Sequence, residues 1–266
     1  MNAKIQGSGF SIERAALVLS NRIMEEAPSL GIGLAVVVGV NALTFLASRT
    51  FVFNHDNGAM WAFAIVISGL LLCAQAFKAM HDGKAGTDWL LLPASPLEKF
   101  SAAVVDYVVL FPIAAALAAT GLSALFHVIE ATAGKVPGPI WTFWNVEVLK
   151  GWACYAVAAT VFVAGSASFR KISFLKTSAV AMAYTFVLGI LLTLGAWIVI
   201  RSHGNFDAGL HINNFNFNFE TEDIPKSIED ITLWVGRIAW FVVLPVFSLV
   251  YGYFRVFEKE ARDEVQ

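Results

Sequence analysis

Residues 102–126 read AAVVDYVVLFPIAAALAATGLSALF, and Asp106 is the only charged side chain among them. The hydrocarbon core of a bilayer is about 30 Å thick, and an α-helix crosses it with about 20 apolar residues. A segment in hydrocarbon must satisfy its own backbone N–H and C=O groups, which favours a helix over a loop. The stretch is therefore predicted to be a transmembrane helix.

Similar apolar stretches flank this one on both sides. They cover residues 30–48, 59–77, 152–168, 178–200 and 231–254, and Arg237 is the only charged residue inside them. Charges are rare in such segments because each one at the bilayer centre costs at least about 2.5–3.5 kcal/mol. The sequence thus predicts an all-α, polytopic integral membrane protein with six transmembrane helices.

The composition excludes several other classes of protein. Hydrophobic residues make up 58% of the 266 residues and charged residues only 14%, too few to cover a soluble globule. The net charge of −2 provides no basic field for nucleic acid. Cys73 and Cys154 both lie in apolar runs and predict two buried thiols, and no Cys/His cluster suggests a metal. No cofactor is expected.

The distribution of basic residues predicts the orientation. Segments 1–29, 78–101, 169–177 and 255–266 hold twelve Lys and Arg residues, whereas 49–58, 127–151 and 201–230 hold five. By the positive-inside rule, the first set faces the cytoplasm. We expect a cell (inner or plasma) membrane protein with cytoplasmic N- and C-termini. Its parts are an N-terminal segment 1–29, a membrane domain 30–254 with an outer segment 201–230, and a C-terminal tail 255–266.

The segment before the first span has the pattern of an amphipathic helix at the membrane surface. Ser11 is a plausible N-cap, and the expected interfacial residues are Ile12, Arg14, Leu19, Arg22 and Ile23. The apolar members share one helical face, and the arginines lie on others. Pro28 is expected to break this helix before the chain enters the bilayer. No cleavable signal peptide is expected, because the first 29 residues lack a compact apolar core.

The connection between the second and third stretches carries the most information. Residues 78–100 read KAMHDGKAGTDWLLLPASPLEKF. Thr87 can cap a short helix that Pro93 ends, with an apolar face at 90–92. Ser95 and Pro96 are placed to start a second helix, with Glu98 in its first turn, where the helix dipole favours an anion. The pattern predicts a short cytoplasmic helix between two spans.

At these residues the sequence resembles the permease subunits of type-2 ATP-binding-cassette transporters. That family often carries Gly-Thr, a Leu-rich turn, Pro-x-Ser, and then Leu with a basic residue. The resemblance implies that the short helix is a coupling helix docked on a separate ATPase subunit, and that the chain works with a second permease copy or a similar permease. The implied ATPase-docking residues are Gly86, Thr87, Leu90, Leu91, Leu92, Pro93, Ser95, Leu97, Glu98 and Lys99.

The chain has no ATP-binding motif of its own. Residues 83–86 read GKAG and lack both the spacing and the Ser or Thr of a phosphate-binding loop, and neither HExxH nor GxSxG occurs. No catalytic residue and no enzyme activity are therefore expected. The resemblance implies the permease subunit of an exporter of unidentified substrate, driven by a partner ATPase. The alternative is a non-transporting membrane anchor or scaffold subunit of a multiprotein envelope complex.

Three features leave alternatives open. The intramembrane charges Asp106 and Arg237 either snorkel to the nearest interface or line a polar path. Small residues recur every four positions in the fourth span and serve either packing within the chain or a dimer; they are Ala156, Thr160, Ala164 and Ser168. The outer stretch 211–220, HINNFNFNFE, alternates like a half-buried strand that either caps the bundle or pairs with another protein.

Overall fold

In a computed structural model of the chain, the described residues are 10–50, 58–82, 86, 87, 89, 91–134, 140–142, 144–202 and 226–263. Their regular structure is entirely helical, which confirms the all-α fold class. The elements are α1 (Ile12–Thr50), α2 (Gly58–Cys73), η1 (Ala79–His81), α4 (Pro96–Val104), η2 (Val105–Leu110), α5 (Phe111–Thr132), α6 (Val146–Ser168), α7 (Ser173–Ser202), α8 (Lys226–Ile238), η3 (Ala239–Val243) and α9 (Leu244–Asp263).

Among the described residues, five helical stretches are long and apolar enough to cross a membrane. They are Ile12–Leu43, Pro96–Thr132, Val148–Ser168, Ser173–Ile198 and Asp230–Ala261. These stretches contain or overlap five of the six expected spans. The remaining one, 59–77, coincides with α2, whose apolar part Ala62–Cys73 is shorter than a full span. The structure therefore gives the chain the helices of a polytopic membrane protein, and the count of six spans stays a prediction.

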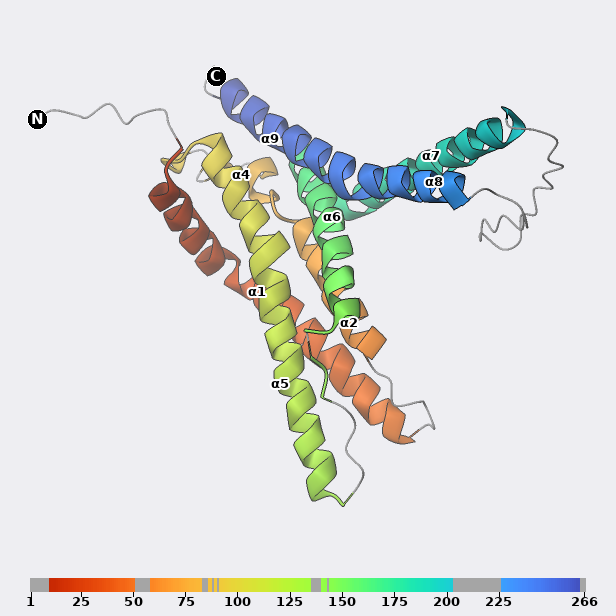
Figure 1. The fold of residues 1–266 in the computed structure, drawn as a ribbon. Coiled ribbons are helices and arrows are strands. Elements are labelled where there is room, and N and C mark those ends of the chain that lie inside the picture. The colour runs from red at the N-terminus through yellow and green to blue at the C-terminus, as the bar shows by residue number, and fades with distance from the viewer. Residues whose placement is uncertain are drawn as a thin grey trace, which may run out of the picture. The chain divides into compact units, whose positions relative to one another are not determined.

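The chain divides into two compact units, residues 1–178 with 245–266 and residues 179–244. In the first unit, α1 packs on α2, α4 and α5, and α2 also packs on α5 and α6 (Figure 1). Small residues and aromatic rings fill the space between these helices, for example Ala103, Ala159 and Phe77. In the second unit, the hydroxyl of Tyr184 on α7 donates to the carbonyl oxygen of Ala239 in η3 at 3.0 Å.

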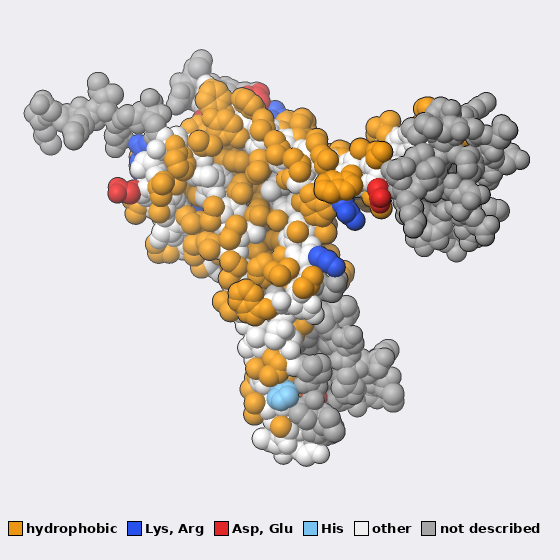
Figure 2. Space-filling view, in the orientation of Figure 1, with side chains coloured by type: hydrophobic (Ala, Val, Ile, Leu, Met, Phe, Trp, Pro, Cys, Tyr) orange, Lys and Arg blue, Asp and Glu red, His pale blue; other side chains and the backbone are white. Residues whose placement is uncertain are grey.

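Apolar side chains cover most of the described surface in the view of Figure 2. Leucine, valine, isoleucine and phenylalanine side chains of α5, α7 and α9 are exposed in large number. Such a surface is unfavourable in water but suits a bilayer, where hydrocarbon surrounds it. The outward-facing residues therefore agree with the transmembrane assignment.

Several local expectations are wrong. Pro28 does not break the N-terminal helix, because α1 continues through it from Ile12 to Thr50. Proline is tolerated inside membrane helices. Its missing amide hydrogen leaves a carbonyl oxygen without a donor, and neighbouring groups satisfy that oxygen. Residues 255–263 of the expected tail continue α9 as helix, and their place outside the membrane stays a prediction. Cys73 is a buried thiol as expected, but Cys154 is exposed. The stretch 211–220 lies outside the described residues.

In the part of the chain that the structure describes, two helical segments are wound as π-helix, and both precede a proline. In η2 the amide of Phe111 donates to Asp106, five residues back, and Pro112 follows. In η3 the amide of Leu244 donates to Ala239, and Pro245 follows. Because proline has no amide hydrogen, the carbonyl groups one turn earlier lose their usual donor. The wider turn and a hydrogen bond from another helix compensate for this loss, as described below for Tyr107.

Candidate functional site

The connection between α2 and α4 ends in the helix start that its sequence predicts. Ser95 is the N-cap of α4 and Pro96 is its first residue. The Ser95 Oγ accepts the amide of Glu98 at 3.3 Å, and the Glu98 carboxylate accepts the amide of Ser95 at 2.8 Å. This reciprocal capping box satisfies two backbone donors that the first turn of a helix otherwise leaves free. It fixes the end of the connection to α4.

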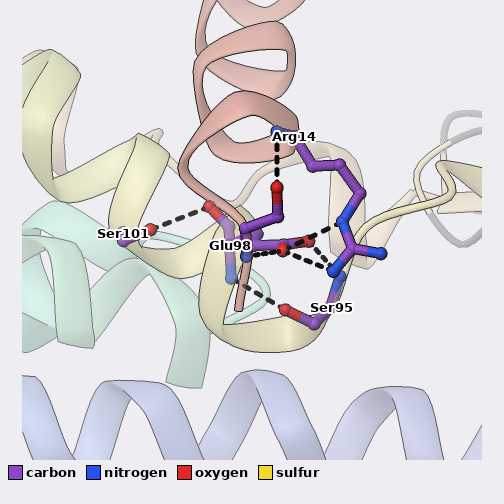
Figure 3. Close-up of polar contacts among 5 residues, drawn as sticks. Arg14, Ser95, Glu98 and Ser101 are labelled. Atoms are coloured by element: carbon purple, nitrogen blue, oxygen red, sulfur yellow. Dashed lines mark hydrogen bonds and ion pairs between the residues drawn. The ribbon is translucent and has the colours of Figure 1, made fainter. Parts of the chain in front are cut away.

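The carboxylate of Glu98 also holds the start of α1. Its Oε1 accepts the amide of Ser11 at 2.7 Å and the Nε of Arg14 at 3.2 Å, and the Arg14 Nη2 lies 3.0 Å away. Figure 3 shows Arg14 reaching from α1 to Glu98, with Ser95 close to both. Glu98 is 0% exposed. One buried carboxylate therefore joins the connection, α4 and α1 through charge-assisted hydrogen bonds.

Lys99 links the start of α4 to the C-terminal helix, α9. The Nζ of Lys99 lies 2.8 Å from the Oε1 of Glu260 on α9 and 4.6 Å from the centre of the Trp89 ring. Lys99 and Trp89 are both buried. The ring face attracts the ammonium group, and the carboxylate compensates its charge. The start of α4 is therefore fastened to α1 through Glu98 and to α9 through Lys99.

The predicted docking residues separate into a buried group and an exposed group. Gly86, Glu98 and Lys99 are buried, and Leu92 packs against the core. Leu91 is 75% exposed, and Thr87, Pro93 and Leu97 are also exposed. Residues 86, 87, 89 and 91 are helical, whereas Leu90 lies outside the described part of the chain.

Glu98 and Lys99, two of the expected docking residues, are ion-paired within the chain. Both charges point into the chain and are compensated there, because a buried ion without a partner is costly. Among the described members of the set, Thr87, Leu91, Pro93 and Leu97 are accessible to a partner. The docking role of the whole set stays a prediction.

Arg14 and Arg22, the arginines of the expected interfacial helix, form ion pairs within the chain. Arg14 binds Glu98, and Arg22 turns toward the interior, where its Nε lies 3.6 Å from Asp106 and its Nη2 lies 2.8 Å from Glu26. Ile12 is exposed, and Leu19 and Ile23 are partly buried. No local sequence pattern indicates these pairs, although an intramembrane acid such as Asp106 favours a cation nearby.

The two intramembrane charges differ in their surroundings. Asp106 is buried between helices and does not snorkel, because it faces Arg22 inside the first unit. Arg237 is exposed in the second unit. The shelf of small residues packs within the chain at Ala164, since a Cβ added to Gly252 of α9 would lie 3.1 Å from the Ala164 Cβ.

His81, in the connection, forms a hydrogen bond with the C-terminal end of α6. The Nε2 of His81 lies 3.0 Å from the carbonyl oxygen of Ser166 and, because a carbonyl only accepts, the nitrogen donates. Burial lowers the pKa of His81 below its ordinary value, and the nearby cations Lys259, Arg170 and Arg255 lower it further, although the bond to Ser166 acts in the opposite direction. The imidazole is thus held neutral.

Within the described ranges, no three His, Cys, Asp or Glu side chains are grouped to hold a metal ion. Comparison of the chain with known protein families, with characterised proteins and with solved structures gives no match. The function is therefore argued from the residues alone.

Proposed function

We propose that the chain is the permease subunit of an ATP-binding-cassette exporter in the cell membrane, with the connection between α2 and α4 as its docking site for a separate ATPase. The observation that carries this proposal is Leu91, which is 75% exposed on a connection outside the apolar stretches. Water does not favour such exposure, and lipid does not cover a segment that leaves the bilayer. A partner protein gives the side chain an apolar environment.

The buried pairs beside Leu91 suit the transmission of force. A push on the connection reaches α4 directly, α1 through Glu98 and Arg14, and α9 through Lys99 and Glu260. Packed helices move as rigid elements rather than deform continuously, so the helices held by these pairs respond together. Closure of two ATPases beneath a pair of permeases then rocks the helices between inward-open and outward-open arrangements.

The first experiment is purification of the full chain from its native membrane in mild detergent, with identification of its companions and measurement of ATP hydrolysis. We expect an ATPase to copurify and to be lost with Leu91→Asp. Leu175→Asp is the matched control, since Leu175 is 65% exposed at the start of α7, in a segment expected on the same side of the membrane. Copurification of other proteins only, unaffected by either variant, contradicts the proposal and favours the scaffold alternative.

A further inference from the structure

Arg22, Glu26 and Asp106 form an ionic cluster between α1 and the π turn η2, in which Asp106 is buried and Arg22 and Glu26 are partly buried. The Arg22 Nη2 lies 2.8 Å from Glu26 Oε1, and the Arg22 Nε lies 3.6 Å from Asp106 Oδ2. Arg22 also donates to the carbonyl oxygen of Ala76, and its guanidinium lies 5.7 Å from the Phe77 ring centre and 5.2 Å from that of Tyr107.

Each of the three charged side chains has an atom that its neighbours leave unsatisfied. The Nε of Arg22, the Oε2 of Glu26 and the Oδ2 of Asp106 are shielded from the exterior and have no hydrogen-bond partner in the described parts of the chain. Asp106 is the most enclosed, with a side chain only 2% exposed and directed at Arg22. An ionised carboxylate left in this condition costs several kcal/mol.

The cluster holds one negative charge more than its single cation can compensate. Glu25, the neighbouring acid on α1, is exposed and accepts a hydrogen bond from Asn21. The end of α2 contributes the neutral Cys73, and η2 contributes the neutral Tyr107. The ion pairs of the described residues give Glu26 and Asp106 no cation other than Arg22. One uncompensated negative charge among apolar groups is unfavourable, and one more positive charge would neutralise it.

We propose that Glu26 and Asp106 together form a binding site for one proton. The proton comes from water and returns to it through Glu26, whose side chain is 25% exposed. When bound, it turns one carboxylate into a neutral carboxyl group, and the other carboxylate keeps Arg22 as its counter-ion. Two carboxylates that share one guanidinium titrate as a pair, so the proton belongs to the cluster rather than to one residue.

This proposal goes beyond the proposed transport function and does not depend on a partner ATPase. The bound proton secures α1 to the π turn that precedes α5, because the unprotonated cluster repels itself. Loss of the proton weakens that contact. The folded chain therefore binds one more proton than the unfolded chain at neutral pH, and its stability falls as the pH rises.

The test is the thermal unfolding of the full chain in phosphatidylcholine nanodiscs between pH 6 and pH 9. Glu26→Gln and Asp106→Asn each leave one carboxylate for one guanidinium. Relative to wild type, both variants should gain in Tm as the pH rises, by about 2–4 °C or more across the range. Glu25→Gln is the matched control and should follow the wild type at every pH.

A Tm difference that stays constant with pH in both variants overturns the proposal, as does an equal effect of Glu25→Gln. Infrared spectroscopy on the folded wild type provides a second readout that does not depend on variant stability. We expect a carboxylic acid C=O band at pH 7 that diminishes at pH 9. Absence of that band at pH 7 also overturns the proposal.

Discussion

Tyr155 on α6 donates its hydroxyl hydrogen to the carbonyl oxygen of Tyr107 at 2.8 Å. That carbonyl lies in the π turn, where Phe111 donates to Asp106 instead and Pro112 has no amide hydrogen to give. Tyr155→Phe removes the donor and leaves a buried carbonyl unsatisfied. We expect a loss of about 1–2 kcal/mol in the free energy of unfolding, measured in detergent or nanodiscs.

Tyr184→Phe is the control for this substitution. Its hydroxyl donates to Ala239, whose carbonyl also accepts the amide of Leu244. Loss of the tyrosine hydroxyl there leaves one donor in place, so a smaller effect is expected. Equal losses in the two variants contradict the account of the π turn at Tyr107.

Close packing of α6 on the start of α7 depends on Gly165. A Cβ at this position would lie 2.0 Å from the Thr177 Oγ1, closer than any non-bonded contact allows. Gly165→Ala should lower the free energy of unfolding by about 1–3 kcal/mol, as overpacking does. Gly151→Ala in the same helix meets nothing within 4 Å and should stabilise by about 0.5–1 kcal/mol.

A double variant checks the cause of that loss. Gly165→Ala with Thr177→Ala removes the two closest clashing atoms, the Thr177 Oγ1 at 2.0 Å and Cγ2 at 2.7 Å, so the free energy of unfolding should recover part of the difference. If the double variant is no more stable than Gly165→Ala alone, the Thr177 contact is not what excludes a larger residue.

The sequence predicts the local features of the site better than its long-range pairs. The local pattern predicts a helix start at Ser95, Pro96 and Glu98, because a capping box depends on residues three positions apart. The pairing of Glu98 with Arg14 joins residues 84 positions apart, and no local pattern encodes it. The helical pattern places Arg22 on a polar face of an interfacial helix, and nothing local indicates that it pairs with Asp106, 84 positions away.

Acidification should destabilise the chain through His81. Its pKa is lower in the folded state than its ordinary value of 6.5, so the unfolded state binds the proton more readily. The stability that this histidine contributes is present above pH 6.5 and is lost as the pH falls below it. His81→Gln keeps a donor for Ser166 but does not titrate, and its Tm should decline less than that of wild type between pH 7 and pH 5. Parallel declines contradict this role.

Glu98 should be required for folding of the site rather than for contact with a partner. Glu98→Ala removes the acceptor for Ser11, Ser95 and Arg14, and we expect a loss of about 1.5–3 kcal/mol in the free energy of unfolding. Glu258→Ala breaks the exposed ion pair with Arg255 and should cost less than about 1 kcal/mol. Thermal or denaturant unfolding compares the two, and similar losses contradict a structural role for Glu98.

The proposed docking of an ATPase on the connection between α2 and α4 can be tested by photo-crosslinking from position 91 in native membranes. A photoreactive amino acid replaces Leu91 in one sample and Leu175 in the control. The account predicts a crosslink from position 91, but not from position 175, to a protein that hydrolyses ATP. Crosslinks from position 91 to lipid alone, or to proteins without ATPase activity, contradict it.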